Sequence, residues 1–257
     1  MNRIKNTILE KGGDILNVYF TAGYPELHST ADIITTLAEC GVDLIELGMP
    51  YSDPLADGTT IQQSSEQALR NGLTLEILFE QIRTARERTD VPIIMMGYYN
   101  QLLQYGEERF LQLAADCAVD GMIIPDLPMD IYQRDYQPLF EQYGIGISFL
   151  ITPTTSLERI QQANELSTAF IYVVSSSSIT GKSGGISPAQ IDYFRKIKEL
   201  GLDSPQLIGF GIHDKATYET ACDYSHGAIV GSAYIRSLHG VDDIRLATTS
   251  FIEGIRS

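Results

Sequence analysis

The feature that most constrains the fold is a unit that recurs eight times along the chain. Each unit is a short apolar run, then a loop with Gly, Pro, Asp or Ser, then a longer amphipathic stretch. The apolar runs are mostly continuous rather than alternating, which indicates strands covered on both faces, and the segments between them are long enough for crossover helices. The eight runs are residues 17–22, 43–50, 91–98, 121–127, 146–151, 170–175, 205–211 and 227–233.

Eight β/α units in 257 residues predict an α/β fold in which parallel strands close into one (β/α)8 barrel over residues 1–257. No linker or low-complexity segment divides the chain. Residues 156–167 exemplify a crossover helix that Ser156 can cap. Its apolar positions at helical spacing are Leu157, Ile160, Ala163 and Leu166. An open doubly wound sheet is the alternative, but the GxGxxG turn of its dinucleotide-binding form does not follow the first run.

Charge and cysteine content narrow the class of protein. The net charge of −15, with scattered Lys and Arg residues, disfavours a nucleic-acid or anionic-membrane surface. The sequence shows no signal peptide and no apolar stretch long enough to span a membrane. Three cysteines, at positions 40, 117 and 222, lie far apart and outside any CxxC pattern. We therefore expect reduced thiols and a cytoplasmic protein.

Two carboxylates lie close together in the stretch ELGMPYSDPLADG, residues 46–58. Glu46 belongs to an apolar run, and burial penalises the ionised form of a carboxyl group, so we expect its pKa to be raised toward neutrality. Asp57 follows in a loop with Gly and Pro, and we expect it to stay ionised. Such a pair suits acid–base chemistry. The alternative is that Glu46 is a capped strand-end carboxylate and Asp57 a turn former.

Two further polar residues lie where reactive groups gather in a barrel, at the carboxyl ends of strands. Asp126, in PDLP after the fourth predicted strand at the end of the run 121–127, is a catalytic candidate, although a carboxylate between two prolines is more often a loop-shaping hydrogen-bond acceptor. Tyr172 lies within the sixth run, where packing is at least as good an interpretation as a phenol aimed at substrate.

The ends of the last three runs and the loops that follow them indicate an anion site. They contain TGKSGG at 180–185, GFG at 209–211 and GS at 231–232. Glycines let backbone N–H groups approach a phosphate closely, and barrels often bind phosphate after strands seven and eight. A Walker A loop is excluded because Ser176 stands where that motif requires Gly, which leaves a mobile polar lid with a solvated Lys182.

The remaining residues indicate chemistry without a cofactor. None of the six lysines lies inside a predicted strand, which counts against a Schiff-base mechanism. The four histidines show no close ligand spacing, which counts against a metal site. Proton transfer by carboxylates on a phosphate-bearing substrate remains.

In order and spacing, ELGMPYSDPLADG, PDLP, the TG-containing loop after the sixth run, GFGI and GSA resemble the tryptophan synthase α subunit family over nearly the whole chain. The first motif is highly specific, whereas GFG and GSA recur in other phosphate-binding barrels. The resemblance implies a TIM barrel of the ribulose-phosphate-binding type. It also implies a lyase of tryptophan biosynthesis that cleaves indole-3-glycerol phosphate to indole and glyceraldehyde 3-phosphate. The implied partner is a pyridoxal-phosphate-dependent β subunit in an α2β2 heterotetramer, and this chain would carry no cofactor.

By matched position, the resemblance also implies roles for single residues. Glu46 would be the principal acid–base group, Asp57 would stabilise the intermediate, and Tyr172 would lie beside the reacting glycerol. Candidates for the apolar indole pocket are Phe20, Tyr98 and Phe210, with core packing the favoured role for Phe20. The segments that would bind phosphate and close the site contain Thr180, Gly181, Gly211, Gly231 and Ser232.

This chain departs from the family pattern just before Thr180, where an arginine and a glycine are common and Ser176 and Ser178 stand here. Loss of a charge-assisted donor and of backbone freedom predicts altered lid dynamics with the chemistry retained. We also expect weak activity from the isolated subunit, because the segment 50–57 matches a subunit interface. The alternatives are another phosphate-binding barrel lyase or isomerase, and a catalytically silent allosteric subunit.

Overall fold

The computed structural model describes residues 2–54, 57–175 and 185–257. Within them a parallel sheet of nine strands has the order β5-β4-β3-β2-β1-β9-β8-β7-β6. Each of the eight predicted apolar runs overlaps a strand, although β1 begins two residues before the predicted run 17–22. The bounds are β1 Ile15–Thr21, β2 Leu44–Gly48, β3 Ile93–Met96, β4 Gly121–Ile123, β5 Gly146–Ser148, β6 Leu150–Ile151, β7 Ile171–Val174, β8 Gln206–Gly209 and β9 Gly227–Val230.

The sheet closes through the fifth predicted run. β5 and β6 stand at the two ends of the strand order, yet only Phe149 separates them in the chain. The backbone N–H of Ala169 donates to the carbonyl of Ile147 over 3.1 Å, and that of Tyr172 donates to the carbonyl of Phe149 over 2.9 Å. β5 and β6 are therefore halves of one strand that joins β4 to β7, which confirms the predicted (β/α)8 barrel.

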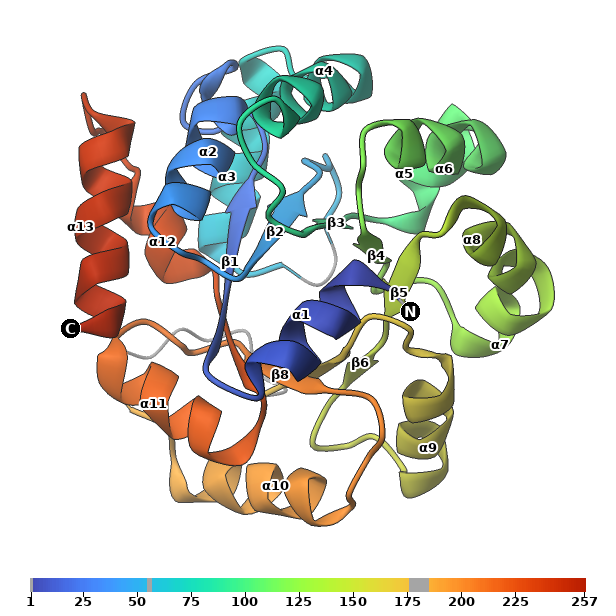
Figure 1. Cartoon of the computed structure of the whole chain (residues 1–257). Coiled ribbons are helices and arrows are strands. Elements are labelled where there is room, and N and C mark those ends of the chain that lie inside the picture. Colours follow the sequence, from blue (N-terminus) through green and yellow to red (C-terminus); the bar gives the residue numbers. More distant parts are fainter. Residues whose placement is uncertain (1, 55–56, 176–184) are drawn as a thin grey trace.

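Helices surround the strands on the outside of the barrel (Figure 1). Their bounds are α1 Arg3–Lys11, α2 Ser29–Glu39, α3 Thr59–Arg70, α4 Leu75–Arg86, α5 Tyr99–Tyr105, α6 Glu107–Asp116, α7 Met129–Ile131, the π-helix η1 Tyr132–Tyr136, α8 Gln137–Tyr143, α9 Leu157–Leu166, α10 Pro188–Glu199, α11 Lys215–Tyr224, α12 Ser232–Ser237 and α13 Ile244–Arg256.

Helix α9 tests the predicted crossover helix. Ser156 caps it by accepting a hydrogen bond from the Arg159 N–H. Ile160, Ala163 and Leu166 are buried as their spacing predicts. Leu157 is 59% exposed, so its predicted place on the apolar face is wrong. As the first residue of the helix, it projects from the end of the turn instead of onto the sheet.

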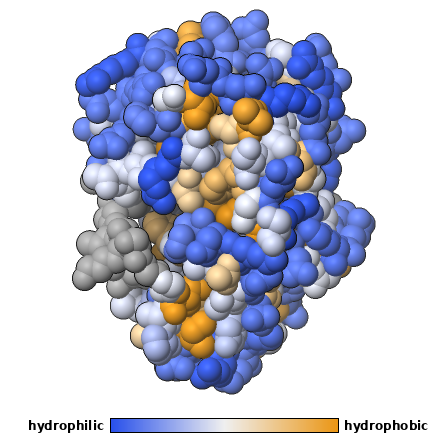
Figure 2. Space-filling view, turned by 90° about the vertical axis from the view of Figure 1, so that its left-hand side faces the viewer, coloured by the Kyte–Doolittle hydropathy of each residue, from blue (hydrophilic) through white to orange (hydrophobic). Residues whose placement is uncertain are grey.

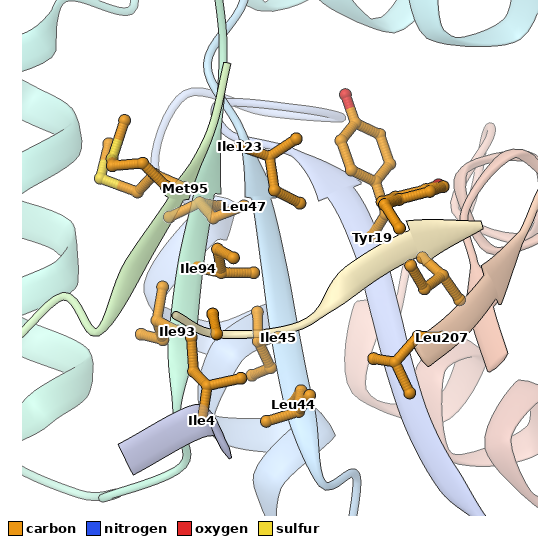
Figure 3. Close-up of a cluster of buried hydrophobic side chains, with 14 of the residues drawn as sticks. Ile4, Tyr19, Leu44, Ile45, Leu47, Ile93, Ile94, Met95, Ile123 and Leu207 are labelled. Carbon is orange, nitrogen blue, oxygen red and sulfur yellow. The ribbon is translucent and has the colours of Figure 1, made fainter. Parts of the chain in front are cut away.

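Helix α1 covers the amino-terminal end of the barrel. Ile4 and Ile8 are fully buried, and Figure 3 shows Ile4 beside Leu44 and Ile93 at the end of the barrel away from the Tyr19 hydroxyl. Asp120 fixes the helix there, because its carboxylate accepts from the Arg3 guanidinium at 2.6 Å. With this end closed, the loops that follow the strands form the accessible end, where barrels carry their sites.

The cysteines, the helices and the surface add three observations. Cys40, Cys117 and Cys222 are all free thiols. In the described ranges no helix has the length and apolarity needed to cross a membrane. The face that carries α13 is mostly hydrophilic, with hydrophobic side chains gathered in a band (Figure 2).

Candidate active site

Glu46 lies in the middle of β2 and is 1% exposed. The strand register places it between Tyr19 of β1 and Ile94 of β3. The pKa of its carboxyl group is raised to about 8, chiefly because burial penalises the charged form; a hydrogen bond from Asn17 opposes the rise and the charge of Asp57 adds to it. The raised pKa expected from the apolar run is confirmed.

Asn17 is a site residue that the sequence reasoning missed. It lies in β1, is fully buried, and donates from Nδ2 to Glu46 Oε2 over 3.1 Å. A polar residue inside an apolar strand was the signal that could have found it, because such a residue needs a partner once it is buried.

Asp57 lies at the end of the loop after β2 and is half-buried. The hydroxyl of Tyr98 donates to its Oδ2 over 3.2 Å. Burial raises the pKa of this carboxyl group, and the Tyr98 hydrogen bond partly opposes that rise. Burial therefore works against the expectation that a loop position keeps Asp57 ionised, and the phenol of Tyr98 works in its favour.

Tyr98 precedes α5 and is buried with its ring stacked on Tyr51, the centroids 5.0 Å apart. Its backbone N–H donates to Gln101 Oε1, and Gln101 Nε2 donates in turn to the carbonyl of Pro50, each over 2.9 Å. The start of α5 is thus tied to the loop after β2, and the two segments bring Tyr98 to Asp57.

Two phenols, Tyr172 of β7 and Tyr19 of β1, project into the barrel beside Glu46. The pKa of the Tyr172 hydroxyl is raised well above its usual value by burial and by the nearby charge of Glu46, and burial and Asp57 do the same for Tyr19. Both remain neutral hydrogen-bond donors. Glycines make room for them: a Cβ at Gly48 would overlap the Tyr19 hydroxyl, and one at Gly209 would overlap the Tyr172 hydroxyl.

The structure does not bring Phe20 to the other predicted residues. Its ring is fully buried and meets the ring of Tyr234 in α12 edge to face, with centroids 6.5 Å apart. Successive side chains on a strand point to opposite faces, so Phe20 points to the helices while Tyr19 points into the barrel. These contacts confirm core packing, the role that we favoured for Phe20. Tyr19 was missed, although it is two residues from Asn17 and therefore on the same face.

The loop after β8 has an unusual backbone. Phe210 adopts φ +67° and Gly211 φ +82°, a region that a bulky residue such as Phe rarely adopts. Ser175, which follows β7, donates from Oγ to the carbonyl of Phe210 over 2.5 Å. The Phe210 ring meets Tyr172 edge to face, with the ring centroids 6.2 Å apart, so these two candidate residues lie side by side. Ser175 was missed, because Ser side chains in loops carry no specific sequence signal.

Gly211 lies at the same end of the barrel as Gly231 and Ser232. β8 pairs with β9 so that Leu207 is opposite Gly227, and Gly211 and Gly231 each lie four residues beyond that pair. Gly231 precedes α12, and a Cβ there would lie 3.3 Å from Tyr19 Cδ1. Gly211 and Gly231 thus follow adjacent strands at the same end of the barrel, with Gly231 beside Tyr19, an arrangement that is compatible with the predicted anion site.

Other candidates lie apart from this cluster or outside the described residues. Thr180 and Gly181, with Ser176, Ser178 and Lys182, fall in the segment 176–184, which is not among the described residues. Asp126 Oδ1 accepts from the Tyr99 N–H at the start of α5 over 2.8 Å, which is the loop-shaping role that we favoured. In the described part of the chain no group of His, Cys, Asp and Glu side chains is arranged to hold a metal ion.

The arrangement has a definite chemical capacity. A carboxyl group with a pKa near neutrality can both give and take a proton at neutral pH. Neutral phenols can donate hydrogen bonds to a substrate, and a second carboxyl group can favour a cation. Glycine-rich strand ends can approach an anion. This set suits proton-transfer chemistry on an aromatic, phosphorylated molecule.

Comparisons with known proteins agree with this geometry. Residues 6–254 match the family model described as tryptophan synthase alpha chain. The tryptophan synthase alpha chain of Flavobacterium psychrophilum is 51% identical over 95% of this chain and 97% of its own length. The subunit alpha structure from Legionella pneumophila superposes with a TM-score of 0.89 at 28% identity, covering 100% of this chain and 97% of that one. A chain of the tryptophan synthase complex from Pyrococcus furiosus superposes with a TM-score of 0.85 at 30% identity, covering 94% and 97%.

Proposed function

The chain belongs to the tryptophan synthase alpha chain family, and on that premise we propose that it cleaves indole-3-glycerol phosphate to indole and glyceraldehyde 3-phosphate. The observation that carries the proposal is the buried carboxyl group of Glu46, whose pKa is about 8. At neutral pH this group is mostly protonated, yet close enough to its pKa to release and recover a proton within one turnover.

Glu46 serves first as an acid and then as a base. It gives its proton to C3 of the indole ring, which converts the ring into an indolenine cation and creates the electron sink that cleavage needs. The carboxylate then takes the proton from the glycerol hydroxyl on the carbon next to the breaking bond. The oxygen forms the aldehyde, the C–C bond breaks, and its electron pair returns to the ring to give indole. Glu46 is protonated again, so the proton balance closes without a further acid or base.

Asp57 and the phenols support these two steps. A carboxylate beside the ring N–H favours the indolenine cation, and the hydroxyl of Tyr98 favours the ionised form of Asp57. Tyr172, kept neutral by its surroundings, donates to the reacting glycerol. The rings of Tyr98 and Phe210 supply walls for the indole. Tyr19 supplies a further wall, because its side chain lies on the inward face of β1, as that of Asn17 does.

The phosphate binds at the glycine-rich end of the barrel. Gly211, Gly231 and Ser232 come from adjacent strand ends, where backbone N–H groups can reach the anion without a basic side chain. This explains how a chain with a net charge of −15 holds a phosphate. Thr180 and Gly181 belong to this set by sequence, and they lie outside the described residues.

The chain acts with a β subunit that consumes the indole, in an α2β2 assembly. Pyridoxal phosphate belongs to that partner, and this chain needs no cofactor for cleavage because Glu46 and Asp57 supply the acid–base and electrostatic chemistry. Three free thiols support a reducing, cytoplasmic compartment.

The test is indole release from indole-3-glycerol phosphate by the purified chain, with and without a β subunit. Glu46→Gln keeps the shape of the side chain and removes the titrating proton, so it should abolish release while the substrate still binds. Release that survives Glu46→Gln would contradict the assignment of Glu46. A wild type that binds substrate but releases no indole under either condition would instead favour a gating subunit.

A further inference from the structure

Asn17 occupies a position where a polar side chain needs an explanation. It is fully buried in β1, between Leu16 and Val18 in a strand whose residues are all buried. Its Nδ2 donates to Glu46, but no partner for its Oδ1 exists among the described residues. Burying an amide with one group unpaired costs free energy, and leucine has nearly the same shape without that cost. Core stability alone therefore does not account for an amide here.

The register shows from which side Asn17 meets Glu46. Asn17 pairs with Leu44, two residues before Glu46, whereas Tyr19 pairs with Glu46 itself. Asn17 thus lies one layer deeper in the barrel, toward the end that α1 covers. The other titratable groups that face Glu46 are Tyr19 on β1, Tyr172 on β7 and Asp57 in the loop after β2. A substrate that enters from the accessible end meets those groups and Glu46, but cannot reach Asn17.

We propose that Asn17 is a positioning residue for the proton-transfer steps: from beneath the substrate, its amide holds Oε2 of Glu46 and leaves Oε1 to face the reacting atoms. This inference rests on the cleavage reaction proposed above. A hydrogen bond to a known oxygen fixes the side-chain rotamer of Glu46, and proton transfer requires donor and acceptor within hydrogen-bond reach.

An amide suits a carboxyl group that changes its proton twice in one turnover. The observed hydrogen bond from Nδ2 to Oε2 suits the ionised form of Glu46, which can only accept. When Glu46 is protonated, a half-turn of the amide presents Oδ1 as an acceptor. That turn breaks no other hydrogen bond, because Oδ1 has no partner in the described residues. Asn17 can therefore satisfy both protonation states, whereas a side chain with only a donor or only an acceptor would favour one of them.

Removal of the amide takes away a hydrogen bond from both forms of Glu46, but the ionised form loses more, because a hydrogen bond to a charged acceptor is stronger than one to a neutral group. Asn17→Leu keeps the size of the side chain, and Asn17→Val fits a β-strand if leucine disturbs folding. We expect the pKa of Glu46 to rise by roughly one unit in either variant. The alkaline limb of kcat/KM, where free enzyme loses the Glu46 proton, should move to higher pH. We expect kcat to fall by roughly 10- to 100-fold with little change in KM, because substrate does not touch Asn17.

Two measurements test this in the full-length chain with its β subunit: an infrared titration of Glu46 and the kcat for indole release. An infrared titration follows the protonated carboxyl band of Glu46, which is assigned by its loss in Glu46→Gln, and it needs no activity. Ser148→Ala is the matched control, because Ser148 is also buried in the barrel and its Oγ accepts only from the Phe170 N–H among the described contacts. This control should leave the titration and kcat unchanged.

The outcomes separate the two proposals. A shifted titration with a lower kcat in Asn17→Leu or Asn17→Val supports the positioning role. An unshifted titration with an unchanged kcat in a folded variant overturns it. If the wild type releases no indole, the proposed reaction fails. The infrared titration then still shows whether Asn17 controls the Glu46 proton.

Discussion

The hydroxyl of Tyr98 donates to Asp57 Oδ2 over 3.2 Å, joining the start of α5 to the loop that follows β2. The ring of Tyr98 is stacked on Tyr51 of that loop. One side chain thus holds a carboxylate, packs against its loop and presents an aromatic face to the barrel. The orientation of Asp57 therefore depends on the segment after the next strand, not only on its own loop.

Replacing Tyr98 by Phe keeps the stacked ring and removes the donor to Asp57. Because that donor favours the ionised carboxylate, the pKa of Asp57 should rise, and kcat should fall by roughly tenfold, with the larger loss at low pH. The pH dependence of indole release measures this. Tyr51→Phe is the control, because the Tyr51 hydroxyl accepts from Asn100 Nδ2, whereas the donor to Asp57 is the hydroxyl of Tyr98. Equal losses in both variants would contradict the role of the Tyr98 hydroxyl.

Gly48 and Gly209 leave the space that the phenols of Tyr19 and Tyr172 occupy. Gly48→Ala and Gly209→Ala should each displace a phenol, lower the free energy of unfolding by roughly 1–3 kcal/mol and reduce kcat more than tenfold. Chemical denaturation and steady-state assays check both effects. Gly254→Ala, in α13 with nothing near its Cβ position, should be neutral or slightly stabilising. Wild-type activity in Gly48→Ala would show that the reaction does not depend on the observed position of the Tyr19 phenol.

The buried Glu46 should make stability fall as pH rises. Its pKa is raised from 4.5 to about 8 in the folded chain, so the folded state binds more protons than the unfolded state between those pH values. The contribution of Glu46 to the free energy of unfolding is fully present below its pKa in the unfolded chain. It is lost as the pH rises through its pKa in the folded chain. Glu46→Gln should therefore gain up to roughly 5 kcal/mol relative to wild type by pH 9. Urea denaturation at pH 5 and pH 9 measures the difference, and a constant difference would refute a raised pKa.

Ser175 supports the left-handed backbone at Phe210 through its hydrogen bond to the Phe210 carbonyl. Ser175→Ala should release that loop and move both the aromatic wall and the Gly211 backbone. Because these contact the substrate before and during reaction alike, KM should rise by roughly 5- to 20-fold with a smaller change in kcat. Steady-state kinetics give both constants. A drop in kcat at constant KM would show that Ser175 acts on the chemical step instead.

The barrel could be predicted because each strand is a continuous apolar run of the right length, and such runs require cover on both faces. Glu46 could be predicted because it interrupts one of these runs. Which side chains point inward could not, since a continuous run carries no alternation to fix its register. Phe20 was therefore considered for the indole pocket, although its neighbour Tyr19 is the residue that points into the barrel. Asn17 and Ser175 depend on contacts between strands and loops far apart in the sequence.

Leu157 shows the same limit in the helices. Helical spacing placed it with Ile160, Ala163 and Leu166, but the first residue of a helix need not face the sheet, and it is exposed. The burial of Asp57 likewise depends on α5, which approaches its loop only in the folded barrel. Local sequence gives element type and candidate chemistry, whereas the partners of each polar group follow from closure of the sheet.

The measurement that tests the account most directly is indole release from indole-3-glycerol phosphate by wild type and Glu46→Gln, each with and without saturating β subunit. We predict slow release by the isolated wild type, faster release with the partner, and a loss of roughly 10³-fold or more in Glu46→Gln under both conditions. Comparable release by wild type and Glu46→Gln would contradict the central role of Glu46, and a rate unchanged by the β subunit would contradict activation by the partner.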